Sequence, residues 1–231
     1  MQHLKVIAFD ADDTLWVNEP YFRETEDKFC ALLEDFMPLH TAQKALFQME
    51  MKNLKLYGYG VKGFMLSMIE SALEISNHQA KPLVYEKILA FGKELLEKPI
   101  ELLPGVEEVL EKLQPHYRIV VATKGDLLDQ ERKLKKSGLE KYFHHIEIMS
   151  DKQVADYEKL IRHLDIQPSE FMMIGNSLKS DVLPVLEMGG HAVHVPFHTI
   201  WEHERIDHQV EHKNFIQVEH ANELLSVLIK P

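Results

Sequence analysis

Short apolar runs alternate with helical periodicity through the second half of this chain, and this alternation constrains the fold more than any other feature. The run Val6–Phe9 is apolar without alternation, as expected of a strand buried on both faces. Further strands are predicted over residues 118–123, 145–149, 171–174 and 191–195, and helices over 106–113, 127–137, 155–164, 180–188 and 221–229. Such alternation predicts a parallel sheet covered by helices on both faces.

A helical stretch interrupts this pattern after the first strand. From Tyr21 to about Leu96, apolar side chains recur at helical spacing. We therefore expect an inserted all-helical module of roughly 80 residues. The predicted fold class is α/β, with a Rossmann-like three-layer core over residues 1–17 and 98–231 and a helical cap domain over 18–97.

Polar residues follow the predicted strands at their carboxyl ends, where open parallel sheets bind their ligands. The candidates are Asp10 and Asp12 after the first strand, Thr123 and Lys124 at the second, Lys152 after the third, and Asn176 and Asp181 after the fourth. Because these ends meet at one edge of the sheet, we expect the side chains to gather into one site.

These residue types suit phosphoryl transfer. Mg²⁺ prefers hard oxygen ligands, which the carboxylates of Asp10 and Asp181 and the backbone carbonyl of Asp12 can supply. Asp10 beside Mg²⁺ is a competent nucleophile on phosphorus, and the Asp12 carboxylate can move protons at the leaving oxygen and at water. Thr123 and Lys152 can stabilise the charge on the transferred group.

The same residues resemble a known family. Phe9-Asp10-Ala11-Asp12-Asp13-Thr14-Leu15, Thr123, Lys152 and Gly175-Asn176-Ser177 with Asp181 resemble the four ordered motifs of the haloacid dehalogenase superfamily. The resemblance covers Leu4 to about Val195, and the helical insertion is similar to that superfamily's cap of the first type. It implies that Asp10 is the nucleophile and Asp12 the general acid/base. It also implies phosphate-binding roles for Thr123 and Lys152.

The fourth motif departs from the family pattern at Asn176, where an acidic residue is usual. The resemblance implies that this motif helps to hold Mg²⁺, so the candidate metal ligands are Asp10, Asp12, Asn176 and Asp181. An amide can offer an oxygen to the metal or hold a metal-bound water, but it carries one negative charge less than the usual carboxylate. Whether Asn176 binds the metal directly or through water stays open.

The expected function is Mg²⁺-dependent hydrolysis of small phosphate monoesters through an aspartyl-phosphate. Substrate contacts are expected from Thr123, Lys124 and Lys62, the last in a glycine-rich cap segment that could equally be an ordinary turn. Three alternatives stay open: a phosphomutase of the same superfamily, a metal-independent haloacid dehalogenase, and a non-catalytic binding protein.

The composition of the chain limits the classes of molecule that it is expected to bind. The formal net charge of -11 disfavours nucleic acid, and a small phosphorylated metabolite is the expected partner. The N-terminal apolar run is too short for a signal peptide or a membrane span, so we expect a cytoplasmic monomer or homodimer. The single cysteine, Cys30, is expected to be a buried hydrophobe. The 14 histidines fit no tight metal motif and are expected mostly on surfaces and loops.

Overall fold

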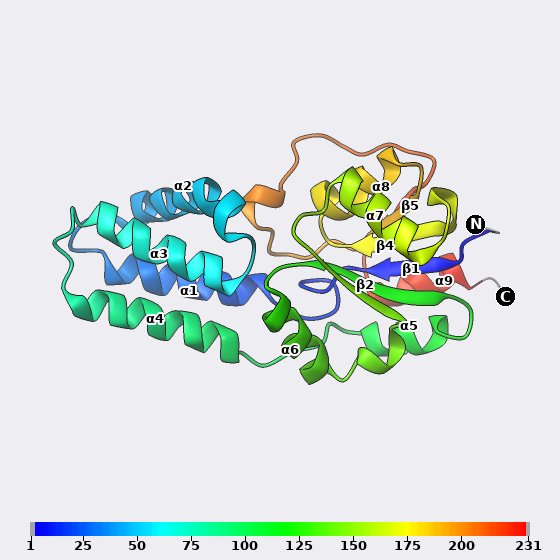
Figure 1. The fold of residues 1–231 in the computed structure, drawn as a ribbon, viewed down its shortest axis with the longest axis horizontal. Helices are drawn as coiled ribbons and strands as arrows, with labels where there is room; N and C mark the ends of the chain where they lie inside the picture. Colours follow the sequence, from blue (N-terminus) through cyan, green and yellow to red (C-terminus); the bar gives the residue numbers. More distant parts are fainter. Residues whose placement is uncertain (1–2, 230–231) are drawn as a thin grey trace. The chain divides into compact units, whose positions relative to one another are not determined.

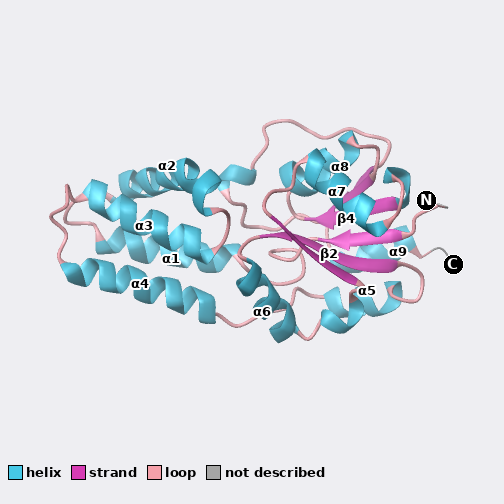
Figure 2. Cartoon of the chain, viewed as in Figure 1, coloured by secondary structure: helices cyan, strands magenta, loops and turns pink. Residues whose placement is uncertain are grey.

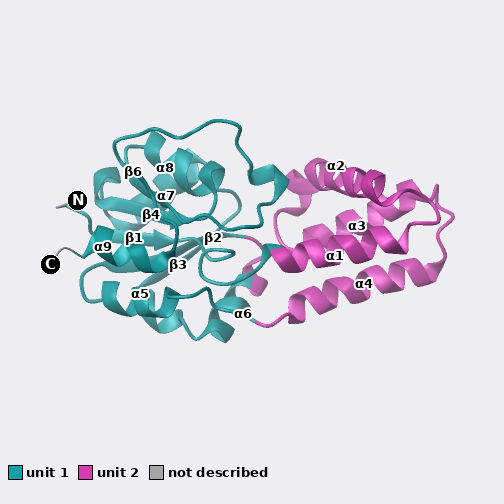
Figure 3. Ribbon diagram, turned by 180° about the vertical axis from the view of Figure 1, so that it is seen from behind, with its two compact units in different colours: residues 1–19, 100–124, 130–231 teal, residues 20–99, 125–129 magenta. Residues whose placement is uncertain are grey.

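The computed structural model describes residues 3–229, which form two compact units (Figure 3). Unit 1 contains the chain up to residue 19, residues 100–124, and the chain from residue 130 onward. Unit 2 contains residues 20–99 and 125–129. The sequence places these boundaries at 17–18 and 97–98, and it assigns 125–129 to the core. No helix within 3–229 combines the length and the apolar character that a membrane crossing requires.

Unit 1 is built on a six-stranded parallel sheet with the order β3-β2-β1-β4-β5-β6. Figures 1 and 2 draw the strands of this sheet as arrows. The strands are β1 (Val6–Phe9), β2 (Arg118–Lys124), β3 (His145–Met149), β4 (Phe171–Gly175), β5 (His191–His194) and β6 (Phe215–Gln217). This confirms the predicted α/β core. Strand β6 is absent from the sequence prediction because its three residues lie in a polar, histidine-rich segment; pairing with β5 extends them.

Helices cover both faces of this sheet. They are α5 (Val106–Leu113), α6 (Leu127–Ser137), α7 (Val154–Leu164), α8 (Leu183–Glu187) and α9 (Leu224–Leu228), with the short turns η1 (Glu140–Tyr142), η2 (Pro168–Glu170), η4 (Glu202–Glu204) and η5 (Ala221–Glu223). Alternate strand residues point to opposite faces. Val6 and Ala8 therefore join a core with Tyr157 of α7, whereas Ile7 and Phe9 join the core that contains α5 and α9.

The helix predicted over 180–188 differs in the structure. It begins as a π-helical turn, η3 (Leu178–Val182), and continues as α8. Hydropathy periodicity does not distinguish one wide turn from an α-helical turn, so the sequence pattern missed it. Single π-helical turns within helices are rare and occur frequently at functional sites.

Unit 2 is all-helical, as expected for the inserted module. Its helices are α1 (Glu19–Leu32, which begins in unit 1), α2 (Leu39–Tyr57), α3 (Val61–Ile75) and α4 (Pro82–Glu97). Phe29, Leu46 and Met68 are fully buried in its core together with Cys30. Burial raises the pKa of the Cys30 thiol to about 12, which fits the predicted structural role.

The register of the central strands aligns their carboxyl ends. Phe9 of β1 pairs with Val121 of β2 on one side and with Ile174 of β4 on the other. The chain builds the sheet outward from β1 to β3 and then returns to add β4 next to β1. The loops after β1 and β4 therefore diverge from a topological switch point, where open α/β sheets place their ligands.

Candidate active site

Lys152 joins two buried carboxylates at the carboxyl edge of the sheet. Its Nζ lies 2.5 Å from Oδ1 of Asp10 and 2.6 Å from Oδ1 of Asp181. These three residues come from the loops after β1 and β3 and from turn η3, and all are buried. The structure thus brings together three of the residues predicted from the sequence.

Burial governs the charges of this cluster. It raises the pKa of Asp10 to about 7, against the opposing effect of the Lys152 ammonium. For Lys152, burial alone would lower the pKa, but the charges of Asp10 and Asp181 outweigh it and hold the pKa above its ordinary value. When both carboxylates are ionised, two negative charges face one ammonium, and a bound cation would offset the excess.

The position of Asp181 depends on the chain that surrounds it. Its Oδ2 accepts a hydrogen bond from the Ser177 backbone N–H at 2.9 Å, and its own N–H donates to the Ser177 carbonyl at 2.8 Å. A Cβ added at Gly175 would lie 2.2 Å from the same Oδ2, so only glycine leaves room for this carboxylate. The glycine of the fourth motif is therefore required by a close contact.

Thr14 connects the first and fourth motifs. Its hydroxyl oxygen lies 3.3 Å from Asp10 Oδ2 and 3.3 Å from Asn176 Oδ1, and it accepts a hydrogen bond from the Asn176 backbone N–H at 3.1 Å. Asn176 is held from the other side, because His194 Nε2 donates to its carbonyl at 3.0 Å. His194 is buried in β5, so it departs from the expectation that the histidines lie mostly on the surface.

The Asp12 carboxylate accepts hydrogen bonds from a separate set of side chains and does not contact Lys152. Trp16 Nε1 donates to its Oδ1 at 2.7 Å, and Gln130 Nε2 donates to its Oδ2 at 2.8 Å. Lys133 of α6 contacts both oxygens, at 2.9 and 3.1 Å. The Asp12 side chain stays 24% exposed, so it remains open to a ligand from solvent.

Gln130 is fixed by its amide nitrogen. Besides Asp12, this nitrogen donates to the Lys124 carbonyl at 2.8 Å. Its Oε1 is buried and lacks a hydrogen-bond partner among the described residues. Leaving such an atom unpaired costs about 1–3 kcal/mol. The two hydrogen bonds of the amide nitrogen must offset this cost, so they determine the orientation of the side chain.

Thr123 and Lys124 end β2. Thr123 is buried, and its hydroxyl lies 3.3 Å from the Lys124 carbonyl, which accepts the hydrogen bond. The Lys124 ammonium lies 2.5 Å from Glu204 Oε1 and 2.9 Å from Ser180 Oγ. Because this ammonium is paired with a carboxylate, its contacts favour a supporting role, and substrate binding by Thr123 and Lys124 stays a prediction.

Glu204 is a buried acid that sequence analysis did not assign to the site. It also accepts hydrogen bonds from the hydroxyls of Ser177 and Ser180. Burial would raise its pKa, but Lys124 and the two hydroxyls outweigh burial and lower the pKa to about 2. The segment after β5 is thereby attached to turn η3, which carries Asp181.

Lys62 lies in unit 2, where its ammonium is 3.0 Å from each carboxylate oxygen of Asp126. Asp126 belongs to the segment 125–129 of the same unit. This ion pair is exposed, and the contact of Lys62 with substrate stays a prediction.

The donor atoms of the buried cluster fit Mg²⁺. The carboxylates of Asp10 and Asp181 and the amide oxygen of Asn176 are hard oxygen ligands, which this ion prefers. The excess negative charge beside Lys152 favours a cation there. Asn176 Oδ1 faces Thr14, so an oxygen is present where the family pattern places a carboxylate.

The sequence did not point to several residues that contact the site, among them Trp16, Gln130, Lys133 and Glu204. Gln130 and Lys133 lie in the predominantly polar helix α6, more than 100 residues from Asp12 in the chain. Only the Asp12–Trp16 contact joins residues close together in the chain, four positions apart, so only this one could be suggested by local sequence.

Comparison with protein families matches residues 4–189 to the family described as haloacid dehalogenase-like hydrolase. A haloacid dehalogenase-like family hydrolase from Xanthomonas campestris is 34% identical, with a TM-score of 0.89 over 98% of this chain and 91% of that one. Comparison with curated proteins gives no match.

More distant solved structures share the fold. The magnesium-bound HAD-hydrolase YfnB from Bacillus subtilis is 17% identical, with a TM-score of 0.65 over 98% of this chain and 99% of that one. A predicted phosphoglycolate phosphatase from Haemophilus somnus is 16% identical, with a TM-score of 0.65 over the same shares. Structures named as dehalogenases are also among these neighbours. At such identities the likeness concerns the fold alone.

Proposed function

This chain belongs to the haloacid dehalogenase-like hydrolases, and from that premise we propose that it is a Mg²⁺-dependent phosphatase of small phosphate monoesters. The observation that carries the proposal is the pair of carboxylates in different surroundings. Asp10 is buried beside Lys152, whereas Asp12, two residues on, is partly exposed and contacted by proton donors. A departing halide needs no proton, so dehalogenation has no use for a general acid in its first step, whereas a departing ester oxygen does.

Asp10 is the proposed nucleophile. One of its oxygens attacks phosphorus, the bond from phosphorus to the ester oxygen breaks, and Asp12 delivers a proton to the departing oxygen. Lys152 contacts Oδ1 and Thr14 contacts Oδ2, so the Asp10 carboxylate is held in one orientation before substrate arrives. The product of this step is an alcohol and an aspartyl-phosphate.

Asp12 serves again in the second step. Water attacks the phosphorus of the aspartyl-phosphate, Asp12 takes the proton of that water, and the Asp10 carboxylate is regenerated as phosphate leaves. Trp16, Gln130 and Lys133 occupy both Asp12 oxygens, so at least one donor must move before Asp12 transfers a proton.

Asp10, Asp181, Asn176 and the Asp12 carbonyl are the proposed ligands of Mg²⁺. When bound, this ion offsets charge on the phosphoryl oxygens. Thr123 is proposed to contact the same oxygens, with Lys124 and Lys62 as further substrate contacts. We propose a small phosphorylated metabolite as the substrate, because the net charge of -11 opposes binding of large polyanions. We also propose that the protein acts in the cytoplasm as a monomer or homodimer.

The test is phosphate release from a panel of phosphorylated metabolites, with Mg²⁺ and with EDTA, and halide release from 2-haloacids in parallel. Asp10→Asn is compared with Asp207→Asn, which makes the same chemical change at a fully exposed position. We expect phosphate release that needs Mg²⁺, is lost in Asp10→Asn and is kept in Asp207→Asn. Halide release without phosphate release from folded protein would overturn the proposal.

A further inference from the structure

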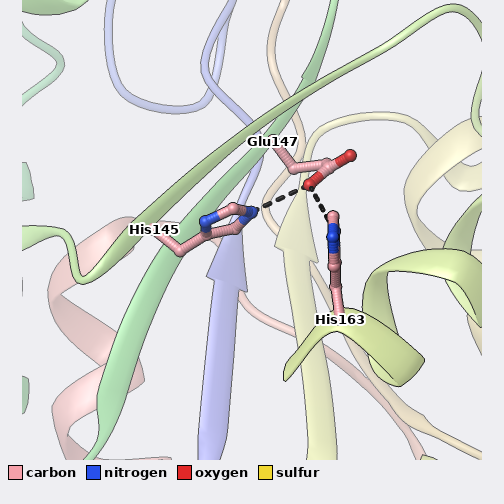
Figure 4. A group of neighbouring side chains, drawn as sticks. All are labelled: His145, Glu147 and His163. Atoms are coloured by element: carbon pink, nitrogen blue, oxygen red, sulfur yellow. Dashed lines mark hydrogen bonds and ion pairs between the residues drawn. The ribbon is translucent and has the colours of Figure 1, made fainter. Parts of the chain in front are cut away.

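We propose that His145, Glu147 and His163 form a binding site for one divalent transition-metal ion, with Zn²⁺ as the ion that their ligand atoms fit best (Figure 4). The proposal is independent of the phosphatase activity. The ligand atoms of the three side chains all lie within 4.8 Å of one another. Within residues 3–229 no other three His, Cys, Asp or Glu side chains converge in this way.

The fold places these side chains on one surface of unit 1. Residues 145 and 147 alternate along β3 and therefore face the same side of the sheet. Met149, two residues further, packs with Tyr157 and Leu160 of α7, so this side is the one that α7 covers. His163 comes from the last turn of α7 and meets the two strand residues there.

One carboxylate oxygen lies between the two imidazoles. Glu147 Oε2 is 2.8 Å from His145 Nε2 and 3.9 Å from His163 Nδ1. A tetrahedral ion with ligands at about 2.1 Å separates its ligand atoms by about 3.4 Å. The two contacts bracket this value, so each of these two distances would change by about half an ångström when Zn²⁺ binds.

A hydrogen-bonded pair accounts for only part of this arrangement. His145 and Glu147 are within hydrogen-bonding distance, but 3.9 Å is too long for a hydrogen bond from His163. The His163 ring nevertheless lies near that of His145, with centroids 6.1 Å apart and planes at 71°. A shared ligand explains why all three converge.

The ligand chemistry separates this site from the one at Asp10. Two imidazole nitrogens and one carboxylate oxygen suit Zn²⁺, whereas Mg²⁺ prefers oxygen ligands throughout. The side chains of His145, Glu147 and His163 are 36%, 28% and 75% exposed, so water can reach the site and complete the coordination. Strand β2 lies between β3 and β1, which places the cluster two strand spacings, about 10 Å, from β1.

An ion at this site would connect β3 to α7. His145 is the first residue of β3, and His163 lies one residue before the end of α7. Binding to the folded state alone raises the midpoint of thermal unfolding. We therefore expect Zn²⁺ to stabilise unit 1 by connecting β3 to the last turn of α7.

The experiment is calorimetric titration of the full chain with ZnCl₂, with Mg²⁺ in large excess to occupy the oxygen site. His163→Gln and Glu147→Gln are compared with His208→Gln, which removes a histidine from an exposed His–Asp pair outside the cluster. Thermal unfolding with and without Zn²⁺, and the visible absorption of bound Co²⁺, give two readouts that do not depend on activity.

We expect one equivalent of Zn²⁺ to bind wild type and His208→Gln. Binding should weaken by at least roughly 10-fold in His163→Gln and in Glu147→Gln, because loss of a direct ligand costs no less than loss of a group that only orients a ligand. The rise in the unfolding midpoint should disappear in the same two variants. Absence of binding to wild type, or binding that is equal in His163→Gln, would overturn the proposal.

Discussion

Lys133 spans the carboxylate of Asp12, with its Nζ 2.9 Å from Oδ1 and 3.1 Å from Oδ2. The same ammonium lies 2.8 Å from Oδ1 of Asn18, in the segment that follows the first motif. Helix α6 thus positions the proposed acid/base through a side chain 121 residues away in the chain. Both side chains are largely buried, so solvent screens this pair less than it screens a surface ion pair.

Replacing Lys133 should slow the chemical step. We expect Lys133→Met to lower kcat roughly 10- to 100-fold, because a misplaced catalytic group loses its alignment with the substrate. KM should change little, and Lys133→Arg should recover part of kcat because a guanidinium can also contact both oxygens. Steady-state kinetics on the best substrate make the measurement. Equal kcat in wild type and Lys133→Met would show that Asp12 does not need this contact.

Removing the Lys152 ammonium should cost stability as well as activity. Lys152→Met leaves Asp10 and Asp181 buried without their cation, and breaking such a pair typically costs about 3–5 kcal/mol. Urea unfolding without Mg²⁺ measures this loss. Lys159→Met, at an exposed position on α7, should stay within about 0.5 kcal/mol of wild type. Similar unfolding free energies for the two variants would contradict the burial argument.

Gly175→Ala tests the close contact beside Asp181. The new methyl group would lie 2.2 Å from Asp181 Oδ2, so the carboxylate must leave its contact with Lys152. We expect phosphatase activity to fall at least 100-fold, which corresponds to about 2.7 kcal/mol in the barrier. Gly138→Ala is the control, since open space surrounds Gly138 and only its φ of +72° is strained, by about 1–2 kcal/mol. That variant should unfold more easily yet keep its kcat.

Glu204 should make stability depend on pH in acid. Its pKa is about 2 in the folded protein against 4.5 as the ordinary value, so its ionised form stabilises the fold above about pH 4.5. This contribution, on the order of 3 kcal/mol, is lost as the pH falls from about 4.5 through 2.

Unfolding in urea at several pH values compares wild type with Glu204→Gln. Glu204→Gln should be less stable at neutral pH, and the difference should shrink across the acid window. The exposed Glu211→Gln provides the reference for a general effect of charge. A difference between wild type and Glu204→Gln that stays constant from pH 7 to 2 would rule out this ionisation as its cause.

Local sequence was enough to predict that Asp10, Lys152 and Asp181 come together. Each follows an apolar run that ends at the same edge of a parallel sheet, and strand order brings such ends together. The helical insertion was also predictable, because its periodicity continues through four helices.

The partners of Asp12 and Lys124 were not predictable in the same way. Gln130 and Lys133 have the composition of a solvent-exposed helix face, and Glu204 lies in a polar segment after β5 with only a short helical turn. Their roles arise from contacts between segments that are distant in the chain, which periodicity does not report. Strand β6 was missed for a related reason, since pairing with β5 and not its own composition makes it a strand.

The π-helical turn η3 makes the active site sensitive to the length of the chain. In this turn the Leu183 N–H bonds to the Leu178 carbonyl, five residues back, so the turn holds one residue more than an α-helical turn. Deleting one residue between Ser177 and Asp181 would permit a regular helix, but it would rotate Asp181 and the rest of the helix by about 100°. The carboxylate would then turn away from Lys152 although every proposed catalytic side chain was still encoded. The number of residues in this segment is therefore as much a determinant of the Asp181–Lys152 contact as their identity.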